Sequence, residues 1–162
     1  LRASEAAELT WKQVNNERAE LRFWHGDTKN SEHFVMPLSS IAKQVIWEAK
    51  QVQGELVFPL SSIENAQMSS WSYFNKCVRK ASLVEDFILH DLRRTFSTLM
   101  AEQSDVSESL IDSLLNHKQS ATRGGVIRHY QQSKNLEKRR DVMAQWGKLL
   151  EAWVESTLVT DE

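Results

Sequence analysis

The sequence predicts an α+β domain that is mostly α-helical and carries a small three-stranded antiparallel sheet near its N-terminus. Short extended stretches separated by turn residues lie between residues 11 and 38, which is typical of antiparallel strands. From residue 65 onward, apolar residues recur at three- and four-residue spacing, as on one face of a helix. The chain has 162 residues, 41% hydrophobic and 26% charged, so it can bury the core of one globular domain.

The N-terminal part combines one short helix with the sheet. A serine followed by helix-forming residues predicts a helix over residues 4–9, with the serine as its cap. Extended stretches are expected at residues 11–14, 19–25 and 32–38. The sequence GDTKNS between the last two has the composition of a turn, so we expect a hairpin there.

The remaining elements are predicted to be helices. Residues 37–52 contain a capping serine and apolar residues at helical spacing; Gly54 ends this helix, and residues 55–62 form an extended connector. Further helices are expected at residues 65–81, 89–103, 107–117 and 135–154. In the helix over 89–103, the predicted inward stripe consists of Leu92, Phe96, Leu99 and Met100.

Composition excludes several classes of protein. The apolar runs are short and no basic N-terminal stretch precedes one, so neither a membrane span nor a signal peptide is expected. Cys77 is the single cysteine, with no neighbouring ligands of the kind that bind zinc, and a reducing cytoplasm fits best. Residues 76–140 carry a net charge of +4 and residues 141–162 a net charge of −4, which is compatible with an anionic partner.

The segment FILHDLRRTFSTLM places basic side chains on a helix that otherwise builds core. His90 and Arg93 are three residues apart and therefore lie on one helix face. Alone, such a pair is ordinarily a surface histidine and arginine. The rest of the chain, however, supplies three further basic residues and a tyrosine that stands beside basic residues: Arg2, Lys29, His117 and Tyr130.

Five segments, in this order, resemble the catalytic domain of tyrosine recombinases, the integrases of phages, prophages and genomic islands. LRASEAAELTWKQV is similar to the first-arginine box of the family, and DTKNSEHFVMPLS to its lysine hairpin. HDLRRTFST is very close to the HxxR box, LLNHK resembles the second-histidine box, and VIRHYQQSKNLEKRRDVMAQW resembles the nucleophile segment and closing helix. The resemblance implies site-specific recombination through a 3'-phosphotyrosine intermediate, with neither metal, cofactor nor ATP.

The resemblance also assigns roles, and the chemistry of a phosphodiester fits them. Arg2, Arg93 and His117 would bind the phosphate, because arginine offers a planar, permanently charged fork for its oxygens. Tyr130 would be the nucleophile; a phenol with a pKa of about 10 needs nearby cations and a proton acceptor, for which His90 is suited. Lys29 would protonate the leaving 5'-oxygen. Glu5, one turn from the first arginine, would hold the histidine or arginine in place.

Further expectations concern partners and domain limits. Contacts with the DNA backbone are expected from Arg94, Lys118, Arg123, Arg128 and His129. Partners would be double-stranded attachment sites, a homotetramer in the synaptic complex and accessory DNA-bending proteins, in the cytoplasm at the nucleoid. Residues 1–162 would be the catalytic domain of a longer protein that has N-terminal DNA-binding domains, so the isolated piece need not be active. Residues 149–162 would be mobile, folded back or docked on a neighbouring protomer.

Two departures and three alternatives accompany this interpretation. The chain starts immediately before Arg2, where relatives have earlier helices, and the spacing from His117 to Tyr130 is slightly longer than usual. A type IB topoisomerase uses a similar set of residues to relax DNA, and a decayed integrase would be a DNA-binding module without activity. A metal site on His90 and His117 lacks an accompanying HExxH motif or cysteine ligands.

Overall fold

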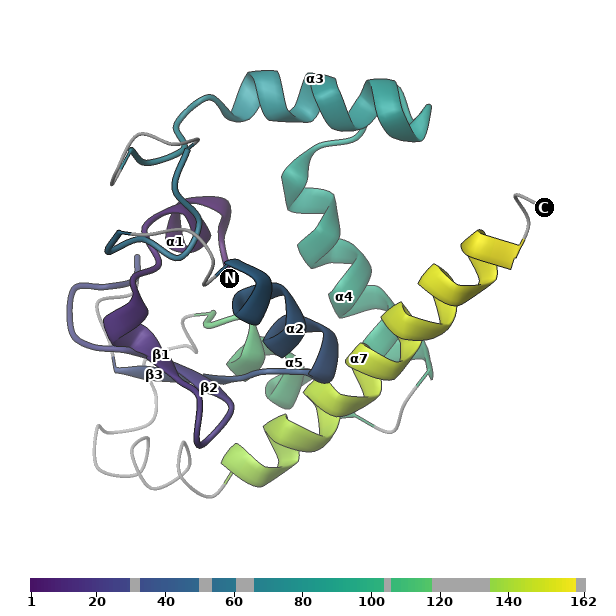
Figure 1. Cartoon of the computed structure of the whole chain (residues 1–162). Helices are drawn as coiled ribbons and strands as arrows, with labels where there is room; N and C mark the ends of the chain where they lie inside the picture. The colour runs from purple at the N-terminus through teal and green to yellow at the C-terminus, as the bar shows by residue number, and fades with distance from the viewer. Residues whose placement is uncertain (30–32, 50–53, 61–65, 104–105, 118–134, 160–162) are drawn as a thin grey trace.

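The computed structural model describes residues 1–29, 33–49, 54–60, 66–103, 106–117 and 135–159. Helices surround a small sheet near the N-terminus, as Figure 1 shows, which confirms the predicted α+β class. The elements in chain order are α1 Ala3–Ala7, the 3-10 helix η1 Trp11–Gln13, β1 Val14–Asn15, β2 Glu20–Phe23, β3 Phe34–Pro37, α2 Ser40–Ala49, α3 Trp71–Ser82, α4 Leu89–Gln103, α5 Glu108–Leu114 and α7 Leu136–Val159.

The sheet is antiparallel throughout, with the strands in the order β1-β2-β3. Glu20 pairs with Pro37 and Phe23 with Phe34, so β2 and β3 form the expected hairpin. The first predicted strand is shorter than expected, because residues 11–13 form a 3-10 turn. The side chain of Gln13 accepts a hydrogen bond from the backbone N–H of Thr10 at 2.9 Å, which closes that turn and leaves two residues for β1.

Helix α7 crosses the molecule and packs against α2, β3, α4 and α5 (Figure 1). Gly147 permits this close approach: a Cβ there would lie 2.8 Å from the Cβ of Ser39, which caps α2. Trp146 stacks edge-to-face on Phe96 of α4, with ring centroids 5.3 Å apart. The sheet, α2, α4, α5 and α7 therefore share one core.

Helix α4 shows one error in the predicted inward stripe. Phe96 and Met100 are buried as expected, but Leu92 is 56% exposed. Leu92 precedes Phe96 by one turn, at the end of α4 that α7 does not cover, and it lines a cavity instead of filling the core. Helix α3 contains no buried residue and is joined to the start of α4 by a hydrogen bond from Arg79 Nε to the carbonyl of Phe87. None of the described helices is long and apolar enough to cross a membrane.

Candidate functional site

The loop after α5 fixes the position of His117. The last turn of α5 ends in a Schellman motif: the N–H of Asn116 points to the carbonyl of Ser113, and the N–H of His117 donates to the carbonyl of Asp112 at 3.1 Å. This motif needs a residue with positive φ after the helix, and Asn116 has φ +51°. The helix end therefore dictates where the His117 backbone lies.

The side chain of His117 joins two helices. Its Nδ1 lies 2.9 Å from a carboxylate oxygen of Asp112, and its Nε2 lies 3.4 Å from NH2 of Arg93. The same guanidinium nitrogen donates to the carbonyl of Leu115 at 2.8 Å. Arg93 on α4 and His117 after α5 are thus brought together, although 24 residues separate them in the sequence.

Arg93 is half-buried, and charges on both sides shift its pKa. Burial lowers the pKa of Arg93, the nearby charge of Arg2 lowers it further, and Glu5 opposes the shift. Its NH1 is buried and has no hydrogen-bond partner in the part of the chain that the structure describes. Among the described residues, the groups that hydrogen-bond to Arg93 are a carbonyl and an imidazole, with no carboxylate in direct contact. Such a cation favours an anionic ligand.

Arg2 is held at the site by Glu5. The buried carboxylate of Glu5 accepts the backbone N–H of Arg2 at 2.7 Å and its NH1 at 2.8 Å. Burial alone would raise the pKa of Glu5, but these two hydrogen bonds and the Arg2 charge outweigh burial, and its pKa is lowered. Helix α1 consequently begins at Ala3, with Arg2 rather than the predicted Ser4 as its cap. Glu5 therefore contacts the arginine, and no described contact joins it to a histidine.

The hairpin that carries Lys29 is tied to the same loop. Thr28 is buried, and its hydroxyl accepts a hydrogen bond from Nδ2 of Asn116 at 3.2 Å. Lys29 is the next residue and is exposed. Because Asn116 directly precedes His117, one hydrogen bond links the lysine hairpin to the histidine loop.

The other predicted residues are placed less closely or not at all. His90 is exposed in the first turn of α4, one turn before Arg93. Arg94 points away from the cluster and forms an exposed ion pair with Asp91 at 3.1 Å. The remaining predicted residues lie outside the part of the chain that the structure describes: Lys118, Arg123, Arg128, His129 and Tyr130.

Sequence analysis missed three residues that organise this site: Asp112, Asn116 and Thr28. A signal existed for Asn116, because asparagine directly after the last apolar residue of a helix is typical of the left-handed cap position. Asp112 lies five residues before His117. This spacing brings the two side chains together only when the helix ends between them in a Schellman motif. Thr28 had no sequence signal, since its partner is 88 residues away.

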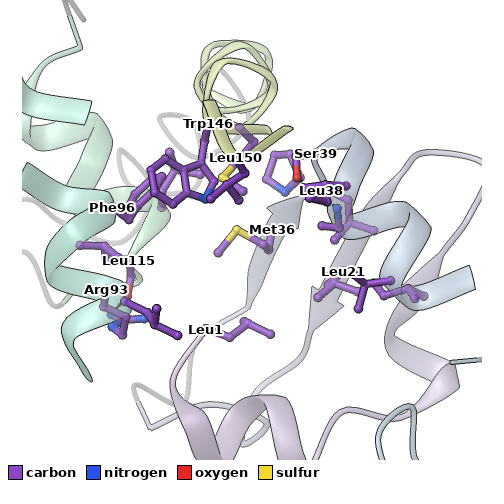
Figure 2. A pocket seen from close by; sticks show the side chains of 18 of the residues that line it. Leu1, Leu21, Met36, Leu38, Ser39, Arg93, Phe96, Leu115, Trp146 and Leu150 are labelled. Carbon is purple, nitrogen blue, oxygen red and sulfur yellow. Dashed lines mark hydrogen bonds between the residues drawn. The ribbon is translucent and has the colours of Figure 1, made fainter. Parts of the chain in front are cut away.

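A separate, apolar cavity of about 750 Å³ lies between α2, α4, α7 and the sheet (Figure 2). Arg93 is the one charged side chain among the described residues that line it, and it lies at one end beside Leu1 and Leu115. Apolar walls cannot replace the water around a phosphate. A phosphate would therefore bind on the polar side of Arg93, towards His117, and outside this cavity.

Comparison with known proteins identifies the family. The sequence model of the phage integrase family matches residues 1–136, a stretch that runs from the first arginine through Tyr130. The chain belongs to this family. The predicted resemblance to a tyrosine recombinase catalytic domain is thereby confirmed.

A curated relative is similar to most of this chain. This integrase domain is 29% identical over 153 residues to the prophage integrase IntA of Escherichia coli strain K12. The match covers 93% of this chain and 36% of the relative. The chain thus spans about a third of the length of the relative that it matches.

Proposed function

We propose that the protein containing this domain cuts and rejoins DNA at specific sites, and so integrates or excises a mobile element. Family membership supports the class of reaction. The observation that carries the proposal to this site is Arg93, a half-buried cation that contacts His117 and has no carboxylate in direct contact among the described residues; the charge of Arg2 also acts on it. A scissile phosphodiester supplies the missing negative charge.

In the proposed reaction, three residues bind the two non-bridging phosphate oxygens. Arg93 and Arg2 present guanidinium groups, and His117, as an imidazolium, adds a donor from Nε2. Negative charge grows on these oxygens as the nucleophile approaches, so fixed donors stabilise the transition state more than the ground state. Each donor would contribute on the order of 3 kcal/mol, by analogy with the removal of one oxyanion-hole donor.

The bond changes would involve residues on three further segments. The phenol oxygen of Tyr130 attacks phosphorus while His90 accepts the phenol proton. The bond from phosphorus to the 5'-oxygen breaks, and Lys29 donates a proton to that oxygen. The products are a 3'-phosphotyrosyl link and a free 5'-hydroxyl. Attack by the 5'-hydroxyl of another strand reverses these steps without ATP or metal, because the energy of the phosphodiester is retained in the covalent link.

The proposed partners follow from the reaction class. Exchange of strands between two duplexes requires double-stranded attachment sites and a homotetramer, assisted by accessory DNA-bending proteins. Arg94 is exposed on α4 and is available to a DNA backbone once its weak surface pair with Asp91 opens. Lys118, Arg123, Arg128 and His129 are proposed to make similar backbone contacts.

The C-terminal segment from residue 149 is proposed to dock on a neighbouring protomer. In the structure it continues helix α7 to Val159, with Leu149 against the core and Trp153 stacked on Trp146 at 6.0 Å. Trp153 is still 42% exposed, so part of its apolar surface remains in contact with solvent.

Covalent capture tests the proposed function. The full-length parent protein is incubated with a nicked attachment-site duplex, from which the cleaved strand diffuses away and leaves the enzyme attached. We expect a protein–DNA adduct that resists denaturation for the wild type and none for Tyr130→Phe, which should still bind DNA. An adduct in Tyr130→Phe would remove this tyrosine from its role. Relaxation of supercoiled DNA without any exchange of strands would indicate topoisomerase activity instead.

A further inference from the structure

We infer that Asp112 is a positioning residue that orients His117 towards the scissile phosphate, an inference that rests on the function proposed above. The Asp112 carboxylate lies 2.9 Å from Nδ1 of His117. A carboxylate only accepts hydrogen bonds, so Nδ1 must carry the hydrogen in this contact. The opposite ring nitrogen, Nε2, is then directed at Arg93, where the phosphate would bind.

Two contacts from the same residue hold His117. The carbonyl of Asp112 accepts the His117 backbone N–H at 3.1 Å, and its carboxylate holds the ring. The first contact fixes the chain and the second fixes rotation of the side chain. When the ring is an imidazolium, both nitrogens carry a hydrogen, so Nε2 can donate to a phosphate oxygen while Nδ1 donates to Asp112. Both contacts are needed, because a small rotation of the ring would move Nε2 away from the ligand.

Local stability does not account for a carboxylate at this position. Asp112 lies in the last turn of α5, where the helix dipole disfavours negative charge. Both side chains of the pair are about half exposed, with relative exposures of 50% for Asp112 and 46% for His117. Exposed pairs of this kind contribute little to folding. The contact between Asp112 and His117 therefore orients the imidazole ring and adds little to the stability of the domain.

The first test is a double-mutant cycle for cleavage in the full-length protein, on the nicked duplex described above. We expect Asp112→Ala to slow adduct formation by about 10- to 100-fold, the range seen when outer partners of metal-binding histidines are removed. Asp112→Glu should recover part of the rate. DNA affinity, measured in a Tyr130→Phe background, should stay within about twofold of the unmutated background, because one exposed carboxylate makes no contact with the ligand.

The decisive comparison is with His117→Ala. If Asp112 acts only through the histidine, adding Asp112→Ala to His117→Ala should cause no further loss of rate. Asp141→Ala, which removes an exposed carboxylate from α7, is the matched control and should cleave at the wild-type rate. Additive losses in the double mutant, or a wild-type rate in Asp112→Ala, would overturn the inference.

A second measurement tests the inference independently of catalysis. The full-length protein is labelled with ¹⁵N-histidine, and the His117 ring signals are assigned by their loss in His117→Gln. We expect the neutral ring to carry its hydrogen on Nδ1 in the wild type and to lose that preference in Asp112→Ala. A neutral ring with its hydrogen on Nε2 in the wild type would overturn the inference even if no adduct ever forms. Absence of an adduct together with the expected ring signals would contradict only the proposed function.

Discussion

Two Arg-Arg pairs on two helices have opposite surroundings. In α4, Arg93 turns inward to the candidate site and Arg94 turns outward to Asp91. In α7, Arg139 is buried with its guanidinium over the ring of Phe34 at 5.6 Å, and Arg140 donates to Glu20 at 2.6 Å. The difference between the pairs lies in the first arginine: Arg139 is 3% exposed, whereas Arg93 is half-buried and contacts His117.

Glu20 is the buried carboxylate that joins arginines of the α7 region. It is 1% exposed and accepts hydrogen bonds from Arg22 at 2.8 Å and from Arg140 at 2.6 Å. The pKa of Arg139 is lowered to about 10 by burial and by the nearby charge of Arg140, while the charge of Glu20 opposes the shift. In the candidate site, Glu5 and Asp112 contact Arg2 and His117, while Arg93 receives no carboxylate contact among the described residues. A buried carboxylate shared by arginines supports folding, whereas a half-buried arginine without a direct carboxylate contact is prepared for an anion.

The largest expected effect on stability is at Glu20. Glu20→Gln leaves Arg22, Arg139 and Arg140 without their common negative charge, so we expect the free energy of unfolding to fall by about 3 kcal/mol. Urea unfolding followed by circular dichroism measures this change. In the candidate site, Arg93→Ala should lower the free energy of unfolding by less than about 1 kcal/mol, because NH1 of Arg93 has no hydrogen-bond partner to lose among the described residues. Equal losses in both variants would remove the distinction between the clusters.

A smaller effect is expected where the lysine hairpin meets the histidine loop. Asn116→Gly keeps the positive φ of the helix cap but removes the hydrogen bond to Thr28. We expect stability to change by about 1 kcal/mol or less. Cleavage of the nicked duplex should slow several-fold, since the position of Lys29 becomes less defined. Asn116→Ala strains the left-handed backbone as well, and it should therefore lose more stability than Asn116→Gly.

The smallest expected effect is a dependence of stability on pH at Glu5. Its pKa is lowered on folding, so the ionised carboxylate stabilises the native domain above its unfolded pKa of about 4.3. This stabilisation is lost as the pH falls through the lower, folded pKa. The difference in unfolding free energy between wild type and Glu5→Gln should be about 0.5 kcal/mol at pH 7 and should shrink towards zero in acid. A difference that grows as the pH falls would contradict the assigned direction.

Much of the fold follows from local patterns in the sequence. Helical periodicity predicted α2, α4 and α7, and turn residues predicted the β2–β3 hairpin, because both signals depend on neighbours in the chain. The exposure of Leu92 depends on how far α7 extends over α4, which periodicity cannot report. The 3-10 turn at residues 11–13 depends on one side-chain contact by Gln13.

The site was predictable only in part, for a similar reason. The HxxR motif places Arg93 on a helix face by itself, whereas the charge balance around Arg93 depends on residues from α1 and α5. The sequence RR at 93–94 and at 139–140 looks alike, but Arg139 is buried against the ring of Phe34 on β3, whereas Arg93 is half-buried beside His117. Long-range packing therefore decides which arginines are structural.

The most direct test removes the negative charge of the scissile phosphate, which Arg93 is proposed to bind. Arg93→Ala and the wild-type full-length protein are compared on a nicked duplex with an ordinary scissile phosphate, and on one with a neutral methylphosphonate there. We expect the variant to be about 100-fold slower on the phosphate, the loss typical of a removed transition-state donor. On the methylphosphonate, the two proteins should form adducts at similar rates, since one negative charge has been removed from the substrate. An unchanged 100-fold difference on the neutral substrate would contradict the account.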